Sequence, residues 1–126
     1  MIVGLGVDLA EVDRVEAAIA RYGQAFLQRV FTPAEIRYCE RHRNRIERYA
    51  ARFAAKEAAM KALGTGWRRG VRWVDIEVAN LPGGRPTLVL HGRTKELADE
   101  KGVRNIALSL THTADLAFAM VIFEGD

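Results

Sequence analysis

Hydrophobic and polar residues alternate along the first segment of the chain. Over residues 2–9, the odd-numbered positions from Val3 to Leu9 are all apolar, while the even-numbered positions include two glycines and Asp8. An apolar residue at every second position is typical of a β-strand, because successive side chains point to opposite sides. We therefore expect a buried strand in which the glycines clear space beside Asp8.

The rest of the chain mixes helical spacing with further short strands. Apolar residues three and four positions apart predict helices over residues 11–22, 33–40, 45–63 and 93–101, and a short turn or helix over 25–31. Turn residues between apolar runs predict strands over residues 73–78, 86–90, 105–111 and 116–123, the last two forming a hairpin. The mixture predicts a single α+β domain over residues 1–126, with helices packed on one side of a largely antiparallel sheet.

Two helix ends carry specific signals. Thr32, Pro33 and Glu35 look like a capping box, with Thr32 as N-cap and Glu35 closing back onto it. Gly64 follows the alanine-rich segment 45–63 and predicts the end of that helix.

Glu57 interrupts the apolar face of the helix expected over residues 45–63. That face is formed by Ile46, Ala50, Phe53 and Met60. A surface pair between Glu57 and Lys61 would stabilise the helix by only about 0.2–0.5 kcal/mol. Burying a charge costs several kcal/mol, so a metal or a functional cleft explains Glu57 better.

Asp8 is the second unusual carboxylate. Alone, it is explained by a cap on the helix that begins near Glu11. Together with Glu57 it offers two hard oxygen ligands, and magnesium is commonly held by one or two carboxylates, waters and substrate phosphates. The chain has no histidine and cysteine pattern for zinc. The pair therefore indicates phosphate chemistry on magnesium.

Cationic and small residues offer candidate phosphate ligands. Arg45, Arg48, Arg52 and Lys56 form a separate stripe on the long helix, and arginine suits bidentate phosphate recognition, although a solvated face explains Arg48 at least as well. The backbone N–H groups of residues 64–66, beginning at Gly64, could also face a phosphate, and a helix stop explains them equally well.

A third candidate segment lies near the C-terminus. Ser109 and Thr111 alternate with leucines, so we expect them to share a strand face that ends at His112. Histidine at a strand end can bind phosphate or transfer a proton, although a lone histidine is more often structural. The chain shows no pattern for a covalent nucleophile.

Composition and charge narrow the class of protein. The 126 residues are 49% hydrophobic and 28% charged, and no apolar run approaches the roughly 20 residues of a spanning helix. The first residues lack a basic segment and carry Asp8, so we expect no secretory signal there. Cys39 is the only cysteine, so we expect a cytoplasmic protein without disulfides. Residues 37–52 hold six arginines against two glutamates, which favours an anionic partner as much as a merely solvated face.

Three segments together resemble a known family. Residues 4–8 (GLGVD), 52–66 (RFAAKEAAMKALGTG) and 109–112 (SLTH), with Arg14, resemble bacterial holo-acyl-carrier-protein synthase, the small, single-unit type of phosphopantetheinyl transferase. The resemblance extends over essentially the whole chain. It implies transfer of the 4'-phosphopantetheine arm from coenzyme A to a serine of an acyl carrier protein in fatty acid biosynthesis, with adenosine 3',5'-bisphosphate released. It also implies a homotrimer with active sites between subunits, and it leaves open whether Asp8 and Glu57 lie on the same side of the cleft.

The resemblance also implies roles for individual residues. Asp8 and Glu57 would coordinate magnesium with the coenzyme A pyrophosphate, and Lys61 would neutralise charge there or assist the departing nucleotide. The catalytic base is left open between the two carboxylates and a metal-bound water, which we favour because a tight metal ligand is a poor free base.

The remaining assignments concern the two substrates. Arg14 and Arg21 would dock an acidic helix of the carrier protein, while Ser109 and His112 would lie near the coenzyme A phosphates.

Two other classes are compatible with the residues alone. A small basic nucleic-acid-binding module would explain the arginines, but the chain lacks interleaved aromatic residues and any known nucleic-acid motif. A magnesium-dependent phosphohydrolase would use the same carboxylates.

Overall fold

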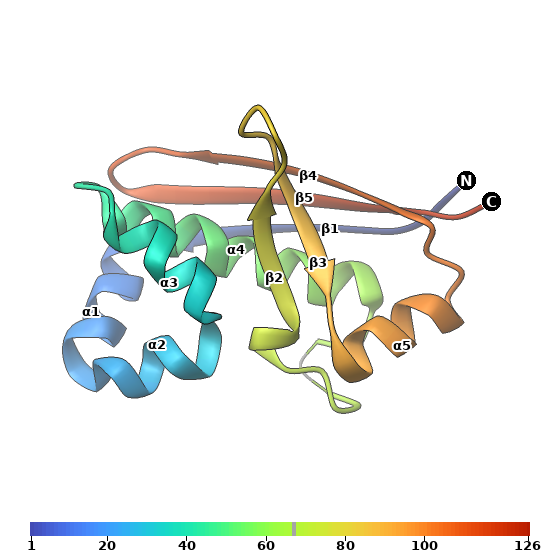
Figure 1. Cartoon of the computed structure of the whole chain (residues 1–126), viewed down its shortest axis with the longest axis horizontal. Helices are drawn as coiled ribbons and strands as arrows, with labels where there is room; N and C mark the ends of the chain where they lie inside the picture. The colour runs from blue at the N-terminus through green and yellow to red at the C-terminus, as the bar shows by residue number, and fades with distance from the viewer. Residues whose placement is uncertain (67) are drawn as a thin grey trace.

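The computed structural model describes residues 1–66 and 68–126, and it combines two antiparallel sheets with helices (Figure 1). In chain order the elements are β1 (Ile2–Glu11), α1 (Val12–Tyr22), α2 (Gln24–Val30), α3 (Pro33–Glu40), α4 (Arg45–Leu63), the 3-10 turn η1 (Trp73–Asp75), β2 (Ile76–Asn80), β3 (Pro86–Leu90), α5 (Gly92–Glu100), β4 (Asn105–His112) and β5 (Leu116–Glu124). The larger sheet has the order β1-β5-β4, and β2 pairs with β3 in a separate hairpin. The expected α+β class is confirmed, with the antiparallel strands divided between two sheets.

The helix ends predicted from capping residues are confirmed. Thr32 Oγ1 accepts a hydrogen bond from the Glu35 N–H, and Glu35 Oε1 accepts one from the Thr32 N–H at 2.8 Å. Gly64 ends α4 in the left-handed conformation at φ 80°, which glycine adopts without steric strain. Local signals thus set the limits of α3 and α4.

The prediction of a strand over residues 73–78 is wrong in its first half. The chain forms the turn η1 there, and β2 begins only at Ile76. The Asp75 N–H donates to the Arg72 carbonyl at 3.1 Å, and the Asp75 carboxylate accepts two hydrogen bonds from the Arg72 guanidinium. These local hydrogen bonds give the backbone an alternative to strand pairing.

The strand β1 and the helix α4 approach so closely that two positions of β1 admit no side chain. A β-carbon on Gly6 would lie 1.8 Å from the carbonyl oxygen of Ala58, and one on Gly4 would lie 2.3 Å from that of Ala62. Glycine on the strand and alanine on the helix therefore set the spacing of the two backbones. Asp8, two residues after Gly6 on the same strand face, is placed against the C-terminal half of α4.

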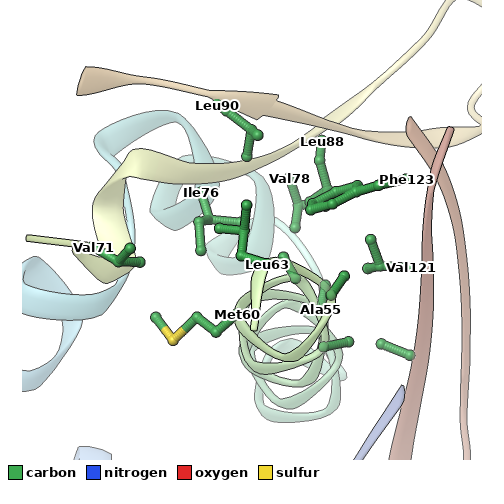
Figure 2. Packing of buried hydrophobic residues seen from close by; sticks show 14 of the residues in the cluster. Ala55, Met60, Leu63, Val71, Ile76, Val78, Leu88, Leu90, Val121 and Phe123 are labelled. Carbon is green, nitrogen blue, oxygen red and sulfur yellow. The ribbon is translucent and has the colours of Figure 1, made fainter. Parts of the chain in front are cut away.

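The main core lies between α4, the β2–β3 hairpin and the inner face of the larger sheet (Figure 2). Figure 2 shows Leu63 of α4, Val78 of β2, Leu88 of β3 and Phe123 of β5 gathered around one space, and all four are buried. Apolar side chains from elements far apart in the sequence thus hold α4 between the two sheets.

The prediction that β1 is buried is wrong for one of its faces. Leu5, Val7 and Leu9 are 58%, 43% and 59% exposed, because α4 covers only the glycine face of this edge strand. Met120 of β5 is partly exposed on the same surface. We call the four side chains Leu5, Val7, Leu9 and Met120 the outer face, and no residue in the described part of the chain covers it.

Lys56 is fully buried and joins three elements. Its ammonium donates to Glu35 Oε1 at 2.8 Å, to the Ile76 carbonyl at 2.6 Å and to the Trp73 carbonyl at 3.1 Å. Burial lowers the pKa of Lys56, and the Glu35 charge opposes that shift. The interpretation of Lys56 as one of a stripe of available cations is therefore wrong, because its charge is neutralised inside the protein.

Removing this buried cation is expected to destabilise the fold strongly. Lys56→Met leaves the Glu35 carboxylate buried without its ion-pair partner, which should lower the free energy of unfolding by about 3–5 kcal/mol. Lys61→Met is the matched control on the same helix; its exposed ion pair with Asp8 should contribute less than about 1 kcal/mol. Urea denaturation measures both, and equal losses for the two variants would contradict the prediction.

Candidate active site

Asp8 and Lys61 form an ion pair where β1 crosses α4. Lys61 Nζ donates to Asp8 Oδ1 at 3.1 Å and to the Val7 carbonyl at 3.0 Å. The Asp8 side chain is 17% exposed and that of Lys61 57%, so the carboxylate is held in place while the ammonium still reaches solvent. The alternative that Asp8 caps α1 is wrong, since Glu11 occupies the N-cap position and Asp8 lies within β1.

Glu57 lies one turn before Lys61 on α4, and its carboxylate is near the ion pair of Asp8 and Lys61. Burial raises the pKa of Glu57 above its ordinary value of 4.5, the Asp8 charge raises it further, and Lys61 opposes both effects. In the described part of the chain, Lys61 forms its ion pair with Asp8 and not with Glu57. Two carboxylates of the same chain therefore lie near one ammonium, which is paired with Asp8 and acts on Glu57 only through its charge.

This donor set fits a hard divalent cation that keeps most of its coordination positions for other ligands. Across residues 1–66 and 68–126, no three histidine, cysteine, aspartate or glutamate side chains gather into a metal cluster. Two neighbouring carboxylates, of which Glu57 has its pKa raised by burial and by the charge of the other, leave negative charge that a cation would neutralise. Magnesium is typically held in this way, with waters and phosphate oxygens completing its shell.

The predicted arginine ligands lie on another side of α4. Arg52 stands five residues before Glu57, which places the two about 140° apart around an α-helix. The Arg52 side chain is buried, donates to Asn80 Oδ1 at 3.3 Å and stacks 3.9 Å from the centre of the Tyr38 ring. Arg45 is more exposed and pairs with Glu40 at 3.2 Å. The structure therefore does not bring these arginines to the carboxylates of their own chain.

The prediction that Ser109 and Thr111 share a strand face is confirmed, since both are exposed at alternate positions of β4, and His112 is the last residue of that strand. Ser109 and His112 are three positions apart on β4, and such residues point to opposite sides of a strand. Ser109 lies beside Met120 of the outer face, whereas His112 Nδ1 lies 3.0 Å from Glu47 Oε1 at the start of α4. Glu47 precedes Glu57 by ten residues, or about 15 Å along the helix. His112 is therefore remote from the carboxylate pair of its own chain.

The remaining predicted residues are exposed. Arg14 and Arg21 stand seven residues apart on α1 and therefore lie on the same helix face. Gly64 closes α4 three residues after Lys61, and the helix stop alone accounts for its conformation. Carrier docking and phosphate binding at these positions stay predictions.

Two partners of the predicted residues were not found by sequence reasoning. Glu47 holds His112, and Tyr38 accepts a hydrogen bond from Arg48 while it stacks against Arg52. Both contacts join residues far apart in the chain or on different helices. The only sequence signal for Glu47 was its place as an acidic residue in the first turn of α4. The helix dipole explains an acidic residue there equally well, so this signal did not indicate a contact with His112.

Comparisons with family models, with curated relatives and with solved structures all point to one protein family. Residues 4–119 match the model of the 4'-phosphopantetheinyl transferase superfamily. The chain is 65% identical to the holo-[acyl-carrier-protein] synthase of Solibacter usitatus over 98% of this chain and 99% of that relative. Among solved structures, the synthase from Neisseria meningitidis is 32% identical with a TM-score of 0.90, covering 98% of this chain and 99% of its own. The synthase from Helicobacter pylori in complex with coenzyme A is 30% identical with a TM-score of 0.84, covering 95% and 99%.

The raised pKa of Glu57 makes a prediction about stability. Above that pKa the ionised carboxylate is unfavourable in the folded chain, so without divalent cations Glu57→Gln should raise the melting temperature near neutral pH. The gain should shrink as the pH falls through the raised pKa and vanish below the ordinary value of 4.5, where the carboxyl is protonated in both states. Thermal unfolding in a chelator measures this, with the exposed Glu124→Gln as control. A loss of stability in Glu57→Gln at neutral pH would contradict the prediction.

Proposed function

The chain belongs to the 4'-phosphopantetheinyl transferase superfamily, and from this premise we propose that it transfers the 4'-phosphopantetheine arm of coenzyme A to a serine of an acyl carrier protein, with Asp8 and Glu57 holding magnesium. The observation that carries the proposal is the pair of carboxylates beside Lys61 at the contact of β1 and α4. The serine oxygen bonds to the β-phosphorus and loses its proton, the bond from that phosphorus to the bridging oxygen breaks, and adenosine 3',5'-bisphosphate leaves. The apo carrier protein thereby becomes the holo form used in fatty acid biosynthesis.

The charge of the site supports magnesium as the cofactor. When bound, magnesium supplies positive charge that polarises the pyrophosphate and stabilises its departing oxygen. Asp8 is already oriented by Lys61, whereas Glu57 is partly buried next to a like charge. A cation between the two carboxylates would favour ionised Glu57 and offset its burial. The same residues suit manganese on charge alone.

Lys61 serves two purposes in this proposal. Its hydrogen bonds to Asp8 and to the Val7 carbonyl fix the position of the first carboxylate. More than half of its side chain is exposed, so the same ammonium can donate to a phosphate oxygen of coenzyme A or to the leaving bisphosphate.

The predicted metal ligands and the predicted phosphate ligands lie in different parts of one chain, which supports an active site made by two copies of the chain. Arg45, Arg52 and His112 lie away from Asp8 and Glu57 of their own chain, so a second copy would have to supply them to the same coenzyme A. The outer face is apolar and uncovered in the described chain, and such surfaces commonly mark protein interfaces. We therefore propose a homotrimer that closes this face and places the active sites between subunits.

The exposed arginines of α1 suit an acidic carrier protein. Arg14 and Arg21 lie on one helix face and would attract acidic side chains, mainly through the rate of encounter. No helix in the described part of the chain is long and apolar enough to cross a membrane. We place the reaction in the cytoplasm, where coenzyme A and carrier protein would meet. Family membership favours this transferase over the nucleic-acid-binding and phosphohydrolase alternatives.

The transfer reaction is tested directly with apo carrier protein, coenzyme A and magnesium. Mass spectrometry should detect the added phosphopantetheine arm, and Glu57→Gln or Asp8→Asn should slow its transfer at least about 100-fold, since each removes a metal ligand. Magnesium should raise the melting temperature of the wild type and not of either variant, because only a bound ligand shifts the folding equilibrium. Wild-type transfer by Glu57→Gln would refute the metal pair, and no transfer by the wild type would refute the function.

The trimer is tested at the centre of the outer face. Val7→Lys should keep the fold, since Val7 is already 43% exposed in one chain, but it should prevent subunits from closing over a charged side chain. Sedimentation should give three chains for the wild type and one chain of 14.1 kDa for the variant, with transfer lost. Val89→Lys, at 41% exposure on β3, is the matched control and should remain trimeric. A trimeric Val7→Lys variant would exclude this interface.

A further inference from the structure

The ring of Tyr38 on α3 gathers three arginines around it. The guanidinium carbon of Arg52 lies 3.9 Å from the ring centre, and those of Arg48 and Arg41 lie 5.7 and 5.8 Å from it. Across residues 1–66 and 68–126, none of the three forms an ion pair with an aspartate or a glutamate. We call Tyr38 and these three arginines the Tyr38 cluster. An aromatic face attracts a guanidinium without neutralising it, so these positive charges remain available to a ligand.

Arg52 is the most restricted member of the Tyr38 cluster. The residue is 4% exposed. Its Nη2 donates to Asn80 Oδ1 at 3.3 Å, and the Asn80 amide is itself fixed by the Gly84 carbonyl at 2.9 Å. Nε is buried and meets no acceptor among the described residues. The ring and Asn80 therefore hold the guanidinium in a position that leaves one of its donors unsatisfied, which is unfavourable in the free chain and is explained when a ligand supplies acceptors.

Tyr38 is in turn fixed at both ends. Its phenol oxygen accepts a hydrogen bond from Arg48 Nη1 at 2.8 Å, and Arg48 Nε donates to Asn44 Oδ1 at 3.1 Å. The Tyr38 carbonyl lies 2.8 Å from His42 Nδ1, and the centres of the two rings are 4.8 Å apart. The same residue thus orients Arg48 through its hydroxyl and holds Arg52 against its ring.

A ring prepares an arginine for a phosphate in a way that a carboxylate does not. Lys56 shows the alternative, because Glu35 neutralises its charge inside the protein. A cation with such a partner would have to give it up before binding an anion. In the described chain Arg52 keeps its charge, and its side chain is already restricted, so it loses less conformational entropy when a ligand binds.

We propose that Tyr38 is a positioning residue for coenzyme A, which orients Arg52 and Arg48 towards a phosphate of the molecule held at Asp8 and Glu57 of a second copy of the chain. Tyr38 itself does not touch the coenzyme and acts through the two guanidinium groups. The inference rests on the proposed transfer function, in which Arg52 is a phosphate ligand, and it assigns the residue that prepares this ligand.

The first test separates coenzyme A binding from catalysis. Tyr38→Leu removes the aromatic face, so the KM for coenzyme A should rise about tenfold while kcat stays within about twofold, because ground state and transition state lose the same interaction. Tyr38→Phe keeps the face and loses only the hydrogen bond from Arg48, so its KM should stay within about threefold of the wild type. An unchanged KM in Tyr38→Leu, a loss confined to kcat, or equal losses in both variants would overturn the proposal.

A double variant tells positioning from a general effect on the fold. Calorimetry with magnesium present measures the Kd of adenosine 3',5'-bisphosphate, the proposed product. Tyr38→Leu should weaken this binding about tenfold in the wild type and less than about threefold in the Arg52→Gln background, because residues that act through one another are not additive. Losses that multiply in the double variant would contradict the proposal. Calorimetry needs no carrier protein, so a wild type that fails to transfer the arm would refute the transferase function and leave this test intact.

Discussion

The contact between β1 and α4 determines the geometry on which the proposed chemistry depends. Gly4 and Gly6 bring the strand backbone against the carbonyls of Ala62 and Ala58, at a spacing that no larger side chain permits on the strand. Because the aspartate and the glutamate of the site belong to these two elements, the same spacing controls how near their carboxylates lie. A glycine with no chemical role of its own therefore acts on the proposed metal site through the distance between two backbones.

The helix α4 carries ionisable residues whose environments differ although they are close in sequence. Lys56 is buried and neutralised by Glu35, so its charge contributes to the connection of α3, α4 and β2. Its neighbour Glu57 faces another side of the helix, where burial and a second carboxylate raise its pKa. A charge that is compensated inside one chain stabilises the fold, whereas an uncompensated one is available for a ligand. The difference arises from the 100° rotation between consecutive residues.

Local patterns predicted most of the elements, and tertiary contacts account for most of the errors. The capping box at Thr32 and the stop at Gly64 depend on residues within one turn, so the sequence alone specified them. The ion pair of Lys56 depends on Glu35, 21 residues away, and no periodicity indicates such a partner. The carboxylate pair was predictable because Glu57 breaks an apolar stripe, whereas the placement of His112 beside Glu47 required the hairpin to be folded onto α4.

Arg52 and Glu57 carry opposite charges on α4, but they lie on different sides of the helix and cannot pair with each other within one chain. Arg52 is buried against Tyr38 without a carboxylate partner among the described residues, and its Nε has no hydrogen-bond acceptor there. Glu57 has the opposite deficit about 140° away around the same helix. A ligand that carries phosphates at both ends, held between two copies of the chain, would satisfy the arginine of one copy and, through a cation, the carboxylates of the other. In the proposed trimer, the apolar face of Leu5, Val7 and Leu9 would supply the association energy, because the charged groups themselves contribute little once they are desolvated.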